Sequence, residues 1–281
     1  MADSFSSKLQ IWDGWLPVFA PGRSLTAGRP VPDTDLADRL FSTEALGHSG
    51  RDTADPYSLQ WFLDAEQARH HRNGAWIPRS LEFTKHPGET LLGLGDGLGT
   101  DWVQYARHGA VVVACGPSEE RLALVRRNFE LRGLSGRFLH VRPEELPLES
   151  ASIDVACVST PLPELGDPAA IVGEVYRVLK PGGKVLAVAS AKYDLEYFRS
   201  IVPWSRPKRT STTQRFSGRG MRRLFSAFVE HRVYKRHLRR GDVPKICRWI
   251  PRSLLQRTVG RYIILKAFKP LSSAIPMPLA A

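Results

Sequence analysis

Three glycines at alternate positions, Gly95, Gly97 and Gly99, follow a short apolar run in the stretch TLLGLGDGLGT. A helical pattern comes next, so the stretch predicts a strand, a tight turn and a helix. Glycine permits a positive φ angle and leaves no Cβ between the backbone and a ligand. The amide N–H groups that open the helix would face whatever lies on the turn. The turn therefore indicates a nucleotide-type ligand; a sharp turn without a ligand is the alternative.

Strand-like and helical patterns alternate through the residues that follow. The run Ala110–Cys115 consists of small or β-branched residues up to its cysteine, as in a strand buried on both faces. Short strands alternating with longer helices predict an α/β fold, with a parallel sheet, right-handed crossovers and helices on both faces. The strands are expected at 90–94, 110–115, 137–141, 153–158 and 184–189, and the helices at 100–108, 118–132 and 168–179.

The region before this alternation divides into two parts. Residues 1–55 are rich in Pro, Gly, Ser and Asp and lack sustained periodicity, which predicts a loosely ordered extension with a short helix near 35–46. A helix is expected from residue 55 or 56 to His71, because proline suits a first helical turn. With the stretch that follows, it forms a lid at residues 56–83. The residues expected on one face of this helix are Leu59, Phe62, Leu63 and Gln67.

After Ser190 the pattern changes, although residues 56–270 are still assigned to one domain. A strand-helix-strand element is expected, and its last strand is antiparallel to the rest of the sheet. The expected elements are a helix at 221–228, a strand at 230–238, a helix at 252–259 and a strand at 262–268. The tail at 271–281 is expected to fray.

The net charge of +12 is distributed unevenly along the chain. Residues 199–270 contain 20 Lys and Arg but only two acidic residues, so the rest of the chain is net negative. This asymmetry indicates an acidic partner for the C-terminal third. Basic residues beside Trp and Leu, as in KICRWIPRSLLQR, fit the surface of an anionic membrane. Nucleic acid phosphates and a plain solvated face are the alternatives.

Several classes of protein are disfavoured by composition. No run of eighteen apolar residues exists, so no transmembrane helix is expected. The first residues lack a basic segment followed by an apolar one, which argues against a signal peptide. Cys115, Cys157 and Cys247 fit neither a disulfide framework nor a zinc site, and we find no other metal-ligating pattern. These features predict a cytoplasmic protein, with peripheral contact at the inner face of the membrane.

The order of motifs resembles that of class I, Rossmann-like S-adenosylmethionine-dependent methyltransferases, of the small-molecule and quinone type. The motifs are GLGDGLGTDWVQYARHGA, VVVACGPSEERL, PEELPLESASIDVA and EVYRVLKPGGKVLAV, and the resemblance covers roughly residues 57–268. It implies that S-adenosylmethionine lies at the carboxyl ends of the strands. The loop at 159–165 would line the methyl-transfer side. The implied cofactor-binding residues are Gly93, Gly95, Asp96, Gly97, Gly99, Cys115, Gly116, Arg142, Pro143, Glu144 and Ser159.

Three acidic residues that the family usually has are missing, since Gly93, Gly116 and Arg142 stand at their positions. A hydrogen bond to a charged group contributes about 1.5–3 kcal/mol, so each loss should weaken cofactor binding about ten- to a hundredfold. Restoring a carboxylate with Gly116→Asp should then tighten binding. Asp96 is the nearest compensating carboxylate, and Glu144 and Glu145 are the next candidates.

Methyl transfer from a sulfonium depends mainly on alignment, so a general base is needed only if the acceptor loses a proton. The candidate bases are His70, His71 and Tyr193, followed by His140; structural roles are the alternative for each. Cys115 and Cys157 could act as nucleophiles, or they could be small buried residues.

The function predicted is S-adenosylmethionine-dependent methylation of a small or lipid-soluble acceptor. The first alternative is a catalytically inactive methyltransferase fold that serves as a binding or scaffold protein, which the missing carboxylates favour. A fold of this type that holds another nucleotide-like ligand is the second alternative. The three glycines of the loop favour the enzyme, because a chain without a ligand has little need of them.

Overall fold

The computed structural model describes residues 57–95, 97–159, 162–195, 197, 214–238 and 249–271. These residues lie in one compact unit of the chain, residues 35–281. The expected extension at 1–55, with its short helix, and nearly all of the tail lie outside the described residues. No described helix is both long and apolar enough to cross a membrane.

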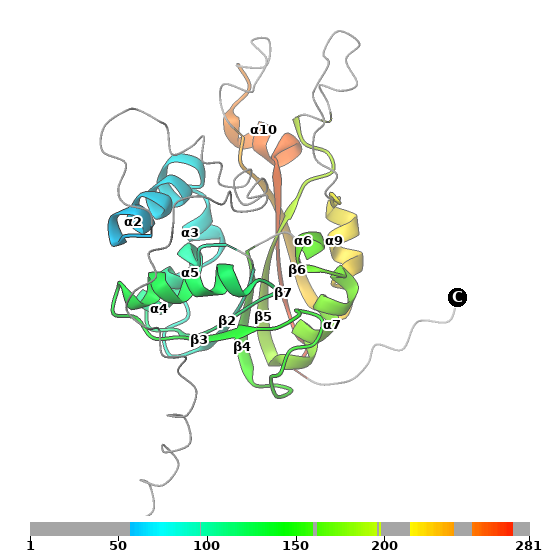
Figure 1. Ribbon diagram of the computed structural model, residues 1–281. Helices are drawn as coiled ribbons and strands as arrows, with labels where there is room; N and C mark the ends of the chain where they lie inside the picture. Colours follow the sequence, from blue (N-terminus) through cyan, green and yellow to red (C-terminus); the bar gives the residue numbers. More distant parts are fainter. Residues whose placement is uncertain are drawn as a thin grey trace, which may run out of the picture. The chain divides into compact units, whose positions relative to one another are not determined.

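A seven-stranded sheet in the order β3-β2-β1-β4-β5-β7-β6 forms the centre of this unit (Figure 1). β1 to β5 pair in parallel, whereas β7 pairs antiparallel with both β5 and β6. The predicted α/β fold with an antiparallel C-terminal strand is thus confirmed. The strands are β1 (Thr90–Leu94), β2 (Val111–Gly116), β3 (Arg137–His140), β4 (Ile153–Val158), β5 (Leu179–Ser190), β6 (Val229–Arg236) and β7 (Tyr262–Phe268).

The helices of the unit are two lid segments and a set that packs on the sheet. They are α2 (Leu59–Gln67), α3 (Ile77–Ser80), α4 (Thr100–Arg107), α5 (Glu119–Glu130), α6 (Leu162–Leu165), α7 (Pro168–Val178), α9 (Gly218–Leu224) and α10 (Arg252–Val259). A π-helical segment, η2 (Ala68–Asn73), continues α2. The helix expected at 252–259 is confirmed. The helix expected at 221–228 is α9 at Gly218–Leu224. It begins earlier because the Ser217 side chain accepts from the Gly220 amide, and it ends before Phe225, its C-cap.

Alternate residues of each strand enter one of two apolar layers, as the period of two in a strand requires. One layer contains Leu92, Ala156 and Val185 together with apolar residues of α6, α7 and α9. The other contains Leu91 and Val155 together with residues of α3, α4 and α5. Because both faces are covered, the strands read as continuous apolar runs in the sequence.

β5 begins at Leu179, five residues before the predicted start of the strand at 184. Leu179 pairs with Ile153 and Lys184 pairs with Val155, so the intervening residues bulge out of the ladder. Gly182 in this bulge has φ +77°, which favours glycine. The bulge therefore interrupts the ladder, and β5 continues on both sides of it.

The lid helix was predicted with the wrong buried face. Phe62 is fully buried, but Leu59 and Leu63 are 40% and 37% exposed. Leu59 and Leu63 lie in the regular turns of α2, whereas the wider turn of η2 changes the direction of the residues after Gln67. As a result, Arg69 and His70 are buried instead.

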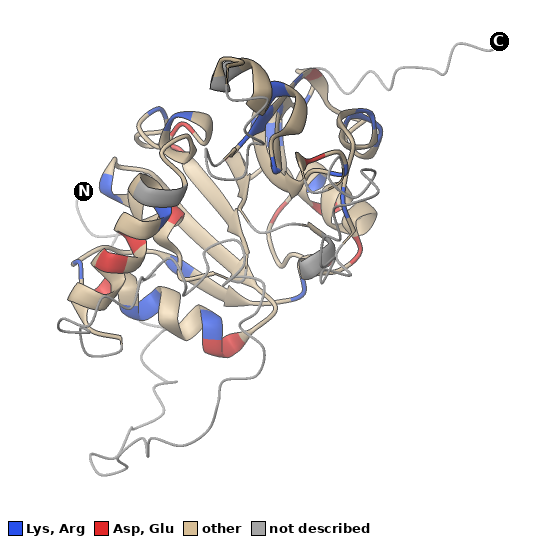
Figure 2. Cartoon of the chain, turned by 90° about the horizontal axis from the view of Figure 1, so that it is seen from above, with Lys and Arg blue, Asp and Glu red and all other residues tan. Residues whose placement is uncertain are grey.

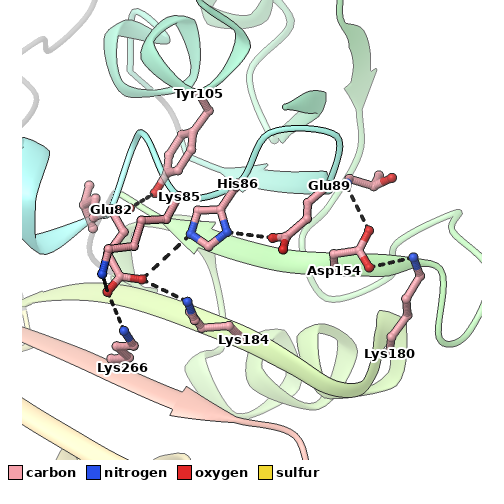
Figure 3. A network of polar contacts seen from close by, with 11 residues as sticks. Glu82, Lys85, His86, Glu89, Tyr105, Asp154, Lys180, Lys184 and Lys266 are labelled. Carbon is pink, nitrogen blue, oxygen red and sulfur yellow. Dashed lines mark hydrogen bonds and ion pairs between the residues drawn. The ribbon is translucent and has the colours of Figure 1, made fainter. Parts of the chain in front are cut away.

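The segment after α3 is anchored to the sheet by Glu82 (Figure 3). Its carboxylate accepts hydrogen bonds from Lys184 of β5 and Lys266 of β7. Lys184 lies near the amino ends of the parallel strands, level with Val155 and Leu91. This anchor therefore lies at the edge of the sheet opposite to the glycine loop.

Candidate functional site

The glycine loop joins the carboxyl end of β1 to the first turn of α4. Gly99 is the N-cap of α4 with φ +69°, and a Cβ at this position would lie 2.6 Å from Val125 Cγ1. Both its conformation and its neighbour therefore require glycine. The Asn128 side chain of α5 donates a hydrogen bond to the Leu98 carbonyl at 2.9 Å and so holds the loop against α5.

Gly97 differs from its neighbours because the space beside it is open. A Cβ at Gly97 would meet no heavy atom of the described chain within 4 Å, and its φ is not in the left-handed region. The fold itself therefore does not require glycine at this position, and the open side of the loop leaves room for a ligand. Asp96, the expected compensating carboxylate, lies outside the described residues.

A buried ionic cluster joins the lid to the helix that follows the loop. Asp101 in the first turn of α4 is 3% exposed and accepts from Arg69 Nε at 2.5 Å and from Arg69 Nη2. His70 Nε2 lies 2.9 Å from Asp101 Oδ1. Burial alone would raise the pKa of Asp101, but the Arg69 guanidinium and the hydrogen bonds hold it well below its usual range. The carboxylate is thus ionised and pairs with both lid residues.

A second ionic chain runs from the lid to the same loop. Glu66 Oε2 of α2 lies 2.6 Å from Arg132 Nη1, and Arg132 Nε donates to Asn128 Oδ1 at 2.8 Å. Asn128 is the residue that holds the Leu98 carbonyl. Two links therefore connect the lid to this region, one to α4 through Asp101 and one to the glycine loop through Asn128.

The space for a carboxylate is closed at two of the three altered positions. A Cβ at Gly93 would lie 2.6 Å from the indole of Trp102, so Trp102 fills the place of a longer side chain. A Cβ at Gly116 would lie 2.6 Å from the Gly95 carbonyl oxygen, which is backbone. The expectation that Gly116→Asp tightens binding is therefore revised, because the new side chain would displace the loop itself.

Arg142, at the third altered position, points into solvent. It is exposed and pairs with the equally exposed Glu145 at 3.2 Å, so its charge does not enter the site. Pro143 is buried. Glu144 accepts from the Asp167 backbone amide at 3.0 Å and thereby braces the start of α7. The described contacts of Glu144 and Glu145 are therefore with other residues of the protein, and none of them points to a bound ligand.

The two described cysteines lie inside the sheet and not at a reactive surface. Cys115 and Cys157 are both fully buried at the ends of β2 and β4. Burial raises the pKa of each thiol to about 12. They are thus protonated at neutral pH, which fits the prediction of small buried residues. Ser159, which follows β4, donates its amide to the Leu94 carbonyl at 3.3 Å and so lies beside the loop.

The other candidate bases are exposed, and the one ion pair among them in the described part of the chain, His140 Nδ1 with Glu119 at 3.6 Å, lies between side chains that are 50% and 82% exposed. His71 is exposed, and Tyr193 is 39% exposed, with its ring packed edge-to-face against Tyr197. His140 is exposed and lies 3.0 Å from the Pro117 carbonyl. Of the predicted bases, His70 is the one held by a buried carboxylate.

Sequence reasoning did not identify Arg69, Asp101, Trp102 or Asn128. Asp101 carried a usable signal, because an acidic residue two positions after the last glycine opens a helix. Arg69 and Asn128 carried none, since their partners are 32 and 30 residues away in the chain.

The resemblance implies S-adenosylmethionine as cofactor, and the site fits its methionine part differently from its ribose and adenine. The open loop at Gly97, beside the start of α4, leaves space against bare backbone, so the glycine-loop side of the site fits the methionine part. Positions 93, 116 and 142 supply no carboxylate to a ribose or an adenine.

Comparisons with known proteins agree with the fold. Residues 91–187 match the family model described as a methyltransferase domain. The demethylmenaquinone methyltransferase of Clavibacter sepedonicus is 33% identical over 129 residues, which cover 41% of this chain and 50% of that protein. That of Thermus thermophilus is 35% identical over 116 residues, covering 40% and 53%. The chain thus spans about half the length of these curated relatives.

Solved structures extend the similarity in fold over most of the chain. A SAM-dependent methyltransferase from Aquifex aeolicus has a TM-score of 0.52 at 15% identity, covering 75% of this chain and 98% of its own. The [4+2]-cyclase SpnF has a TM-score of 0.56 at 20% identity, covering 85% and 94%. At these identities the likeness shows the fold alone.

Proposed function

We propose that this chain, whose residues 91–187 form a class I methyltransferase domain similar to those of quinone methyltransferases, transfers a methyl group from S-adenosylmethionine to a small, lipid-soluble acceptor. The observation that carries the proposal is the loop at Gly97, which stays open beside the start of α4. The names of the curated relatives point to a quinone-type acceptor.

S-adenosylmethionine would supply an electrophilic methyl group on a sulfonium. The chain's own part is to bind and align the two reactants and to keep water out. Backbone N–H groups at the start of α4 favour a carboxylate nearby, and the lid lies over this end of the helix through the Arg69–Asp101 pair. The lid thus closes one side of the site.

His70 is the proposed proton acceptor for an acceptor that must lose a proton. Its Nε2–H donates to Asp101, so that Nδ1 carries the free lone pair. The buried Asp101 carboxylate fixes the orientation of the ring, as in other carboxylate–histidine pairs. An acceptor that needs no deprotonation would not depend on His70.

A second function is favoured by one observation. Trp102 and the Gly95 carbonyl occupy the space of two cofactor-binding carboxylates. A chain that has filled these places could bind a ligand without transferring a methyl group, and serve as a binding or scaffold protein. Binding and transfer must therefore be measured separately.

Calorimetric titration with S-adenosylmethionine tests the proposal. The wild-type chain should bind, and Gly97→Val should bind at least about tenfold more weakly, a loss of about 1.4 kcal/mol. The protein itself has room for the new side chain, so folding should be retained. Gly173→Val is the matched control, because a Cβ on this exposed glycine of α7 also meets open space.

Equal affinity in Gly97→Val and Gly173→Val would show that the loop does not hold the cofactor. Binding without transfer of a labelled methyl group to any quinone acceptor tested would instead support the binding protein.

A further inference from the structure

The C-terminal helix α10 lies at the same edge of the sheet as the glycine loop. Ser190, at the carboxyl end of β5, pairs with Tyr262 at the start of β7, and Arg236 at the end of β6 pairs with Tyr262 as well. α10 directly precedes β7. The Lys235 ammonium donates to the carbonyls of Thr258, at 2.6 Å, and Tyr193, at 2.7 Å, which fastens α10 to the loop after β5.

Large apolar side chains are exposed at this edge. Trp249 is 81% exposed and Leu254 is 52% exposed, whereas Leu255 and Val259 of α10 are partly buried. Leu254 therefore lies on the outer side of α10. One turn further along, Arg257 is exposed as well. We call Trp249, Leu254 and Arg257 the α10 surface.

The surroundings of the α10 surface are basic. Residues 249–271 contain no acidic residue. Among the described residues, no carboxylate pairs with Arg257 or Arg261. Figure 2 shows Lys and Arg segments gathered over the region of α9, β6 and α10. Asp194, on the loop after β5, is paired with Arg215 at 2.8 Å.

We propose that the α10 surface docks on an anionic lipid bilayer. Indole rings prefer the boundary between headgroups and acyl chains, and an outward leucine can enter the same layer. Arginine binds lipid phosphate, and each basic residue near the surface strengthens binding about fivefold. Nucleic acid fits less well, because its phosphates would leave Leu254 without an apolar partner.

This placement would bring the open glycine loop and the membrane to one side of the protein. A lipid-soluble acceptor could then enter from the bilayer without crossing water. This link to the acceptor rests on the proposed methyltransferase function, whereas the lipid contact is tested without it.

The test is co-sedimentation of the full chain with vesicles of phosphatidylcholine, with and without phosphatidylglycerol, at low and high salt. Binding is expected to vesicles that contain phosphatidylglycerol and to weaken with salt. Trp249→Ala should lower the partition coefficient about tenfold, Leu254→Ala several-fold, and Arg257→Glu at least about fivefold. Leu271→Ala is the matched control, since Leu271 is 83% exposed but follows the opposite end of β7.

Failure of the wild-type chain to sediment with anionic vesicles at low salt would overturn the proposal. So would equal effects of Trp249→Ala and Leu271→Ala, or tighter binding to a single-stranded oligonucleotide or an acidic protein that also depends on Trp249. Titration of the same samples with S-adenosylmethionine separates the two proposals, because loss of lipid binding alone leaves the cofactor affinity unchanged. Circular dichroism shows whether each variant is folded. If Trp249→Ala is not folded, Leu254→Ala provides the same test.

Discussion

Replacing Glu82 by Gln should destabilise the folded chain by about 3–5 kcal/mol, because it leaves two nearly buried ammonium groups without their carboxylate. Glu82 is 8% exposed, and its partners Lys184 and Lys266 are 17% and 14% exposed. Lys184 Nζ lies 2.9 Å from Glu82 Oε2, and Lys266 donates to Oε1 (Figure 3). His86 Nε2 lies 3.8 Å away and adds a fourth polar neighbour beside Lys85.

The pKa of Glu82 gives an independent value for its contribution to the free energy of unfolding. Burial alone would raise this pKa, but the hydrogen bonds and charges of Lys266 and Lys184 outweigh burial and lower it from 4.5 to about 2. Such a difference between the unfolded and folded chain corresponds to about 3 kcal/mol. The folded state binds this proton more weakly. The stabilisation is therefore fully present above pH 4.5 and is lost as the pH falls toward 2.

Urea unfolding followed by circular dichroism at about pH 7 and about pH 3 measures both effects. The gap in unfolding free energy between wild type and Glu82→Gln should be large at the higher pH and shrink at the lower one. Glu145→Gln is the matched control, because its ion pair with Arg142 is 75% exposed on each side and should contribute at most about 1 kcal/mol. A gap below about 1 kcal/mol at neutral pH, or one that does not change with pH, would refute the reasoning.

Three further predictions concern the site. Asp101→Asn should lower the unfolding free energy by about 3–5 kcal/mol, because Arg69 then loses its buried counter-ion; urea unfolding close to that of wild type would count against the cluster. Gly116→Asp should lower the melting temperature and not improve binding, since its Cβ meets the loop backbone; tighter binding in a calorimetric titration would contradict this. Cys115 and Cys157 should resist iodoacetamide in the folded chain and react in urea, as peptide mass spectrometry can show; alkylation of the native protein would disprove their burial.

Much of the framework follows from local sequence. The bounds of β1, β4, β7 and α10 agree with prediction, because each is a continuous apolar run or an amphipathic pattern between clear breaks. The glycine loop could be identified for the same local reason, since a positive φ angle at Gly99 needs a residue without a Cβ. Even the burial of Cys115 and Cys157 follows from their position inside such runs.

The candidate site itself was decided only by tertiary structure. In the site, Arg69 contacts Asp101 at a separation of 32 residues. At the opposite edge of the sheet, Glu82 contacts Lys184 and Lys266 at separations of 102 and 184 residues. Periodicity along the chain specifies which face of an element is apolar, but not which charged side chains meet once elements pack. Gly93 shows the same limit. Its missing carboxylate could be read from the sequence, whereas the indole of Trp102 in that space depends on how α4 packs against the sheet.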